Sequence, residues 1–453
     1  MFTTADNSKP LTSKNGKSTR RTSRRMPLLF LLLVGIIPGC ATQQSQTATK
    51  EYMFWPPAPE TPHVEFLTSI ATSRDVTGQQ GNLENILYGK EQTADLPFTR
   101  PYGIRMSQGC IYVCDASAAN VSILDFRKKE VRVIGKSTEM SLLKPIDIAV
   151  APDGIKYVAD TGLSAVIVYD ANDKYAGKIV TPKLRPVSLA IHDTELYVAD
   201  MYASRIRVFD RFNGKELRTI GQSMTENSGK GQLGGVMGIA LDKDGEIYAN
   251  DVLGCRVQKF TPDGKFLFSI GGLGNRAGNF VRPKHMAVDS SGILYVVDNA
   301  FQNVQMFNDK GQMLMFFGAP GTHPGAMQMP VGICTTDSDL DLFQKYSHPD
   351  FEVQRLILVT NDVGGAKISV YGLGVLKPGK TVADLNSARV NRVVGFEDTS
   401  GAPRTLDLSA DATQPAGTQP APTTQPTTVP AASAGTVQTT EPAGMPAANV
   451  AKP

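Results

Sequence analysis

The stretch PIDIAVAPDGIKYVADTGLSAVIVYD, residues 145–170, contains the pattern that decides the fold. A Pro precedes a short apolar run, a turn follows at Asp153-Gly154, and Tyr-Val-Ala-Asp leads through a polar turn into a second apolar run. Asp-Gly supplies the positive backbone torsions that tight hairpins need. Short alternating runs between such turns therefore predict antiparallel strands.

The same pattern occurs six times along the chain. The other copies begin at Pro101, Pro186, Val236 and Pro283, and the sixth begins at Pro330 and resumes at Arg355. One residue marks each copy, at spacings of 40 to 63 residues: Asp115, Asp160, Asp200, Asp251 and Asp298, with Asn361 in the last. Radial repeats of four short strands form a β-propeller, which hides most sheet edges. We therefore predict an all-β fold, a six-bladed β-propeller.

The repeated phrase P-x-G/D-I-A-V, followed by G-x-I/L-Y-V-A-D and R-I-x-V-F-D, closely resembles the NHL repeat. The resemblance spans about residues 62–375 and implies a propeller of the NHL/TolB-like kind. A resemblance at the level of the fold says little about function.

An N-terminal strand is expected to close the ring. The third and fourth copies end in the strand-like runs ELRTIG, residues 216–221, and KFLFSIG, residues 265–271, whereas the sixth copy has no equivalent. HVEFLTSI, residues 63–70, reads like the missing strand. We predict that it completes the last blade as its outer strand.

The first 39 residues have the pattern of a secretory signal, with a basic run, an apolar run over residues 27–37 and a small residue before a cut site. The apolar run is shorter than the ~20 residues of a membrane-spanning helix. Ile37-Pro38-Gly39-Cys40 resembles a bacterial lipobox. We therefore expect lipidation at Cys40 and an exported chain anchored to the bacterial envelope, at the outer membrane facing the periplasm. A plain signal peptide cut nearby and an uncleaved anchor are the alternatives.

The remaining segments divide the chain into regions of different composition. Residues 40–61 read as a tether, residues 62–375 as the propeller and residues 376–400 as a C-terminal extension. Residues 401–453 are rich in Pro, Ala and Thr and contain no aromatic residue. Such a composition buries too little apolar surface to offset the entropy of ordering, so we expect a disordered tail. A wall-spanning spacer or an O-glycosylated segment is the alternative.

The charge of the chain is concentrated in the leader. The first 39 residues carry seven Lys or Arg and one Asp, and the whole chain has a net charge of +3, which leaves −3 for the rest. No surplus of cations remains for neutralising phosphates. We therefore expect no nucleic-acid partner.

The residue after Pro-x in each copy is expected to face the central channel near one rim. These positions are Gly103, Asp147, Ser188, Gly238, His285 and Gly332. His323, in the loop before the sixth blade, is expected to approach the same rim. Asp147, Ser188, His285 and His323 are thus the candidate binding residues at the channel mouth, and the simplest interpretation is a polar channel lining.

A metal site is the alternative interpretation of the same residues. Enzymes with this architecture resemble one another in placing metal ligands near the axis, and a catalytic zinc usually has three protein ligands. His285, Asp147 and His323 would be those ligands here.

Other polar residues are expected to serve the fold. Each marker Asp opens a turn, where its carboxylate caps nearby backbone N–H groups. Arg205 and Arg256 occupy matching positions and are also interpreted as structural. Cys110 and Cys114 lie on one strand, ~13 Å apart, too far for a disulfide bridge. Cys114 and Cys334 stand where sister copies carry Ala, which predicts small buried core residues.

Two longer segments interrupt the repeat and are candidate binding loops. Residues 221–235 are expected on the channel-mouth face, with shorter partners at residues 271–282 and 318–329. Residues 337–354 are inserted into the first hairpin of the sixth blade, on the opposite face. A merely tolerated insertion is the other interpretation.

These observations predict a non-catalytic binding or scaffold module in the envelope, with a protein, peptide or glycan partner and no cofactor. A metal-dependent propeller enzyme of the lyase or lactonase type is the alternative.

Overall fold

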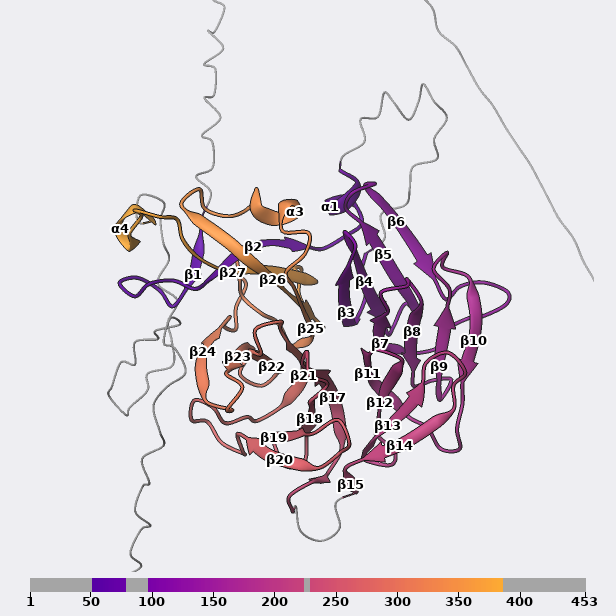
Figure 1. Ribbon diagram of the computed structural model, residues 1–453. Helices are drawn as coiled ribbons and strands as arrows, with labels where there is room; N and C mark the ends of the chain where they lie inside the picture. Colours follow the sequence, from indigo (N-terminus) through magenta and orange to yellow (C-terminus); the bar gives the residue numbers. More distant parts are fainter. Residues whose placement is uncertain (1–50, 79–96, 224–228, 386–453) are drawn as a thin grey trace, which may run out of the picture.

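The computed structural model describes residues 51–78, 97–223 and 229–385. These residues form a ring of six antiparallel sheets, each a blade of the predicted six-bladed β-propeller (Figure 1). The expected leader, Cys40 and the tail of residues 401–453 lie outside the described residues. No helix in the described part is long and apolar enough to cross a membrane.

Four strands, from the axis outward, make up each of the first five blades. Blade 1 contains β3 (Pro101–Ser107), β4 (Cys110–Asp115), β5 (Asn120–Asp125) and β6 (Glu130–Ile134). Blade 2 contains β7 (Pro145–Val150), β8 (Lys156–Asp160), β9 (Ala165–Tyr169) and β10 (Tyr175–Ile179). Blade 3 contains β11 (Pro186–His192), β12 (Glu195–Asp200), β13 (Arg205–Asp210) and β14 (Glu216–Ile220).

Blade 4 contains β17 (Val236–Leu241), β18 (Ile247–Asp251), β19 (Arg256–Phe260) and β20 (Phe266–Ile270). Blade 5 contains β21 (Pro283–Val288), β22 (Leu294–Asp298), β23 (Asn303–Phe307) and β24 (Met313–Phe317). Blade 6 has five strands, β25 (Pro330–Thr336), β26 (Phe351–Asn361), β27 (Ile368–Leu376), β2 (Val64–Ile70) and β1 (Met53–Trp55).

The smaller elements lie in the connections. They are α1 (Arg74–Thr77), α3 (Asp341–Gln344), α4 (Val382–Leu385) and the short parallel pair β15 (Gln222–Ser223) and β16 (Gln232–Leu233).

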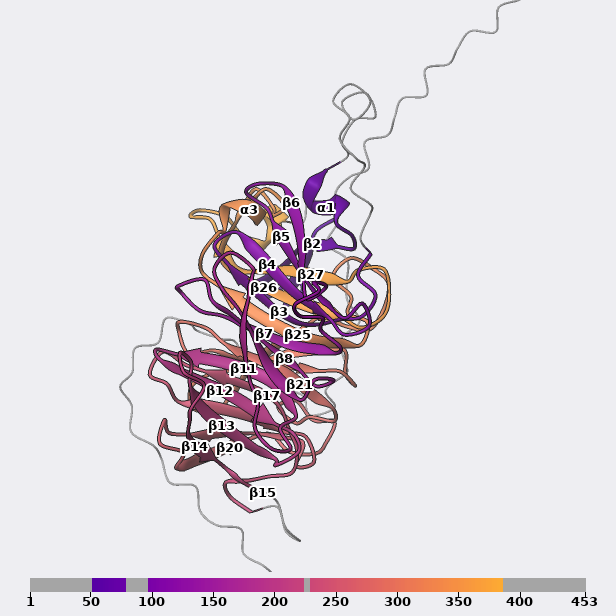
Figure 2. The same cartoon turned by 90° about the vertical axis from the view of Figure 1, so that its right-hand side faces the viewer.

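All six inner strands begin at the same end of the ring. Residues at matching positions are neighbours around the axis. The contacts of Gly103 with Asp147, of Gly238 with His285 and of Gly332 with Tyr102 show this arrangement. We call this end the loop face, since the connections between blades and the turns between second and third strands lie there. The opposite end, where inner strands connect to second strands, is the hairpin face; Figure 2 shows the ring from the side.

Apolar side chains of neighbouring blades pack against each other and form the core. One cluster joins Val121 and Ile123 of blade 1 to Ile148 and Val158 of blade 2, all four fully buried. Each such side chain contributes about 1.5–3 kcal/mol when it leaves water. Because every blade buries both faces of its sheet in this way, a single blade would not be stable alone.

The predicted closing strand is confirmed. β2 pairs antiparallel with β27, with Val64 opposite Leu373 and Ile70 opposite Ile368 (Figure 1). Beyond it, β1 adds a fifth strand, and Met53, Phe54 and Trp55 are buried. Part of the segment that was expected to be a tether therefore belongs to the propeller, because these apolar residues pack on blade 6.

The insertion of blade 6 is part of this closure. Glu65 of β2 is fully buried and accepts hydrogen bonds from Ser347 Oγ at 2.6 Å and His348 N at 2.7 Å. On the other side, Asp339 accepts a bond from Gly109 N at 2.7 Å and pairs with Arg127 of blade 1 at 2.5 Å. The insertion thus fastens blade 6 to blade 1 and to the closing strand, and it is not a free loop.

The marker acids cap backbone groups on the loop face, as predicted. Asp160 accepts bonds from Leu143 N at 2.8 Å and Lys144 N at 2.9 Å in the preceding interblade loop, and from Gly162 N at 2.8 Å in its own turn. Asp115 and Asp298 do the same. Each carboxylate therefore joins the loop that enters a blade to a turn inside that blade.

Replacing Asp160 by Ala should destabilise the protein more than replacing it by Asn. Asp160→Ala leaves several buried N–H groups without an acceptor, so we expect its free energy of unfolding to fall by about 3 kcal/mol. Asp160→Asn keeps one acceptor oxygen, as Asn361 does for Gln328 N in blade 6, and should lose less. Urea unfolding of both variants measures this, and equal stability of Asp160→Ala and the wild type would contradict the assignment.

Candidate functional site

The first layer of the channel consists of the six predicted positions at the start of the inner strands. Its polar members are buried, with exposed fractions of 0 % for Asp147, 1 % for Ser188 and 1 % for His285. The glycines let the strands approach closely: a Cβ on Gly103 would lie 2.5 Å from Asp147 Cα, and one on Gly332 would lie 2.0 Å from Tyr102 O. This layer therefore closes the channel and does not form its mouth, contrary to expectation.

Asp147 is the centre of this layer. Its Oδ2 accepts hydrogen bonds from Ser188 Oγ and Leu189 N, both at 2.9 Å, and its Oδ1 accepts one from Ile148 N at 2.9 Å. Arg105 Nη2 lies 3.6 Å from the same Oδ2, in an ion pair. A buried carboxylate is tolerated when it is hydrogen-bonded and paired, and Asp147 is both.

His285 lies beside Asp147, with 4.0 Å between Nδ1 and Oδ2. Burial lowers the pKa of His285, and Asp147 opposes that effect only in part. The imidazole packs edge-on against the Tyr102 ring at 5.8 Å, and its Nε2 has no hydrogen-bond partner among the described residues. His285 is thus a neutral imidazole at neutral pH.

His323 does not join this group. Its side chain is exposed, and its Nδ1 lies 3.0 Å from Pro324 O of its own loop. Two residues further, Gly325 packs against Trp55 and Phe66 of the closing strands, so this loop follows the outer part of blade 6. Within the described residues, no three His, Cys, Asp or Glu side chains are placed to hold one metal ion. The set of His285, Asp147 and His323 is therefore not assembled.

A polar interaction joins every pair of neighbouring blades near this layer, and we call the set the inner seam. Blades 1 to 4 are joined through Arg105, Asp147 and Ser188, whose Oγ also accepts a bond from Ile239 N at 3.3 Å. Three side chains complete the circle: Asn250 donates to Lys284 O, Asn299 to Pro330 O and Thr360 to Tyr102 O. Most of these polar groups thus serve the ring itself.

The second layer is two residues further along each inner strand. Five of its members are small, Ala149, Ala190, Ala240, Ala287 and Cys334, and the sixth is Arg105. Arg105 reaches across the channel, where its guanidinium donates to Ile104 O at 2.9 Å, to Leu189 O at 3.1 Å and to Ile333 O at 3.4 Å. Sequence reasoning missed this residue, although an Arg where sister copies carry Ala was a visible signal.

A cavity of about 270 Å³ lies above Arg105. Its walls are the second layer and the aliphatic residues Met106, Val150, Ile191, Leu241 and Val288, and its outer lining includes Ser107 and Thr335. Because these residues lie toward the ends of the inner strands, the cavity opens on the hairpin face. Burial raises the pKa of the Cys334 thiol to about 12, so this wall offers no thiolate nucleophile.

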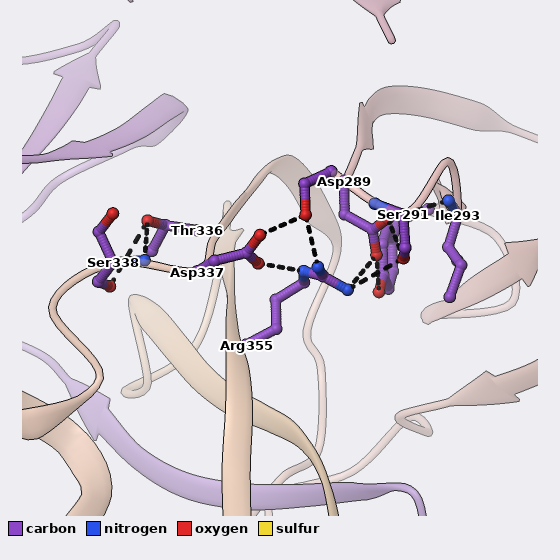
Figure 3. Close-up of polar contacts among 9 residues, drawn as sticks. Asp289, Ser291, Ile293, Thr336, Asp337, Ser338 and Arg355 are labelled. Atoms are coloured by element: carbon purple, nitrogen blue, oxygen red, sulfur yellow. Dashed lines mark hydrogen bonds and ion pairs between the residues drawn. The ribbon is translucent and has the colours of Figure 1, made fainter. Parts of the chain in front are cut away.

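A charged cluster follows two of the cavity strands at the rim of the hairpin face (Figure 3). Arg355 donates through Nη1 to Asp289 at 2.6 Å, through Nε to Asp337 at 2.5 Å and through Nη2 to Ser290 Oγ at 2.9 Å. Tyr295 OH donates to the same Asp289 at 2.8 Å. The cluster fastens blade 5 to blade 6, and its carboxylates are committed to these bonds.

The remaining predictions concern structural residues. Arg256 pairs with Asp251 at 2.9 Å and holds the interblade loop through Gly229 O, as predicted, whereas Arg205 is exposed. The thiols Cys110, Cys114, Cys255 and Cys334 are free, and Cys114 and Cys334 are buried as expected. The ends of the loop at residues 221–235 are tied down by β15, β16 and Arg256, and residues 224–228 of it lie outside the described residues.

Comparison with known proteins reveals similarity of structure alone. No protein-family model and no curated protein sequence matches the chain. A streptogramin B lyase structure matches with a TM-score of 0.42 at 13% identity, covering 61% of this chain and 95% of the other. A protein of unknown function from Bacteroides thetaiotaomicron matches with a TM-score of 0.48 at 17% identity, covering 68% and 75%. Virginiamycin B lyase from Staphylococcus aureus matches at 0.41 and 13%, covering 61% and 95%. The chain is a six-bladed β-propeller similar to these structures, and identities this low show the fold alone.

His285 should make stability depend on pH. The unfolded chain protonates this imidazole near pH 6.5, whereas the folded protein does so only at lower pH, because burial disfavours the charged form. Its contribution to stability is therefore complete above pH 6.5 and is lost as the pH falls below that value.

We expect His285→Gln to reduce the loss of unfolding free energy between about pH 7.5 and about pH 5.5, measured by urea unfolding. The control His323→Gln changes an exposed imidazole and should keep the wild-type slope. Identical slopes for the wild type and His285→Gln would contradict a neutral buried imidazole.

Proposed function

We propose that this protein is a non-catalytic binding module, which holds one side chain or terminal group of a larger partner in the cavity on the hairpin face. The observation that carries the proposal is the one-ended channel, with a closed polar layer below and aliphatic walls open to the hairpin face above. The partner is a protein, peptide or glycan.

The size of the cavity suits one inserted group of such a partner. Pockets that enclose whole ligands have volumes of ~300–1,000 Å³, whereas this cavity measures about 270 Å³. One inserted group fills it, and the rest of the partner lies over the surrounding hairpins. A rigid pocket that anchors a single side chain is the usual centre of a protein interface.

The chemistry of the cavity defines the inserted group. Aliphatic walls from five blades favour an apolar body, and the Arg105 guanidinium at the floor favours a hydrogen-bond acceptor at its tip. Asp147 already pairs with Arg105, so a neutral acceptor suits the site as well as a carboxylate does.

The arrangement of the polar residues supports binding over catalysis. Asp147 and Ser188 are sealed below the cavity, and their oxygens accept or donate bonds within the inner seam. A metal-dependent lyase or lactonase would need His285, Asp147 and His323 at one rim, and the first two are buried while the third is exposed on the outer part of blade 6.

We place the protein at the bacterial envelope as part of this proposal. The NHL-like repeat and the lipobox-like Ile37-Pro38-Gly39-Cys40 together support an NHL-type lipoprotein, held at the bacterial envelope by a lipid on Cys40. The partner is then another component of the envelope.

Filling the cavity tests the proposal. Ala190→Phe places a ring in the cavity, so we expect it to abolish recovery of crosslinked envelope partners that the wild type captures. The control Asn172→Phe alters an exposed turn on the same face and should capture those partners at the wild-type level.

Thermal melting of both variants checks that the fold is intact. Capture of the same partners by folded Ala190→Phe would overturn the proposal.

A further inference from the structure

We propose that the loop face of the propeller docks on an anionic lipid surface. The feature that carries this inference is an unequal distribution of charged and apolar side chains over the two faces of the ring. It is independent of the cavity, which opens on the opposite face.

The loop face is strongly basic within the described residues. Its connections and turns carry ten exposed Lys or Arg side chains and two exposed acids, Asp75 and Glu139. The ten cations are Arg74, Arg100, Lys136, Lys144, Lys183, Arg185, Arg205, Lys230, Arg276 and Arg282. The turns of the hairpin face, in contrast, expose both signs, as Asp263 and Lys265 illustrate.

The repeat itself explains this imbalance. The marker Asp residues of the loop face are turned inward to cap backbone N–H groups, with exposed fractions of 0–1 %, and Asp362, which is not a marker, pairs with Arg100 at 2.7 Å. The cations around them have no such role and remain at the surface. The weakly acidic chain beyond the leader therefore presents one cationic face.

Large apolar side chains stand among these cations. Seven of the twelve exposed large apolar residues of the described chain lie on the loop face, around the whole ring. They are Leu143, Val180, Tyr202, Leu253, Leu273, Val281 and Val363, and Leu273 and Leu253 are 75% and 70% exposed. Exposed apolar side chains at loop tips, placed beside cations, suit insertion at a lipid interface.

The combination favours a lipid surface as the occupant. Lys and Arg at a membrane interface attract anionic headgroups, and each contributes about 1 kcal/mol near the surface. Leu, Val and Tyr side chains beside them enter the boundary between headgroups and acyl chains. Nucleic acid would use the cations and gain little from exposed aliphatic tips.

The direction of β1 favours the same orientation, because β1 runs antiparallel to β2 and its first residue lies toward the loop face. Ten residues separate Cys40 from residue 51 at blade 6, and an extended chain of that length reaches up to ~35 Å. A lipid at Cys40, which rests on the proposed function, then lies in the membrane that the loop face touches. The cavity of the hairpin face points away from that membrane, toward a partner.

Binding to vesicles tests the inference without the lipid. The chain from residue 41 onward keeps the whole described propeller, and its partition is measured by flotation with neutral phosphatidylcholine vesicles and with vesicles containing about 30% phosphatidylglycerol. We expect at least tenfold tighter binding to the anionic vesicles at low salt, and a loss of that preference as salt increases.

Matched variants assign the binding to one face. Lys144→Gln/Arg185→Gln/Arg276→Gln should weaken binding to anionic vesicles by about tenfold or more. Lys215→Gln/Lys265→Gln/Lys310→Gln removes three exposed cations of the hairpin face and should bind as the wild type does. Leu253→Ser/Leu273→Ser should weaken binding several-fold, which a purely ionic attraction would not produce.

Equal binding to neutral and anionic vesicles would overturn the inference, and so would equal losses of vesicle binding in the two charge variants. Binding to double-stranded DNA that is as tight as binding to vesicles, and unaffected by Leu253→Ser/Leu273→Ser, would also overturn it. All substituted residues are exposed, so melting temperatures should stay near the wild-type value. Because the assay uses neither the lipid nor a partner, its outcome is independent of the ligand proposed for the cavity.

Discussion

Six inner strands must meet around one axis without leaving buried polar groups unpaired, and this constraint governs the rest of the structure. The inner seam meets most of it, with at least one polar contact for each pair of neighbouring blades, from Arg105–Asp147 to Thr360–Tyr102. Among the described residues, it leaves His285 Nε2 and the side-chain oxygens of Asn250 and Asn299 without a hydrogen-bond partner. The circle is complete only if blade 6 is complete, which in turn depends on β2 and on its buried Glu65. Glycines at three of the six places, Gly103, Gly238 and Gly332, let the backbones come close enough for these contacts. An unpaired buried polar group costs roughly as much as a whole hydrogen bond, so the seam specifies the ring as well as stabilising it.

The seam also makes the two ends of the propeller different. Near the loop face, the layer of Asp147, Ser188 and His285 is buried and closes the channel. Beyond it, small side chains leave room for a cavity with Arg105 as its floor. The marker acids on the loop face are buried as caps of backbone N–H groups. The exposed charges of that surface are therefore mostly basic. One end is thus suited to an inserted side chain, and the other to a broad anionic surface.

The sequence predicts the architecture better than the site. Six copies of one repeat predict six blades. The sixth copy lacks a last strand, and HVEFLTSI, residues 63–70, has the pattern of that strand and fills its place. Both predictions succeed because the alternation of a strand is a local property of the sequence. The depth of Asp147 and His285 does not follow from periodicity, since it depends on how closely the strands approach across Gly103 and Gly332. The position of His323 depends on a loop that folds outward onto Trp55. The sequence shows that Arg105 departs from the repeat. Its contacts could not be predicted, because its partners lie in three other blades.

Within the described residues, the channel is sealed at its polar layer and open above Arg105. The most direct test compares the rates at which a water-soluble thiol reagent modifies Ser107→Cys, on the cavity wall, and Ser188→Cys, in the sealed layer. Both are made in the chain from residue 41 onward with Cys255→Ser and Cys334→Ala, which removes Cys40, the part-exposed thiol and the thiol of the cavity wall. We expect rapid modification of Ser107→Cys and modification of Ser188→Cys only at the rate of global unfolding. Similar rapid modification at both positions would contradict a sealed polar layer.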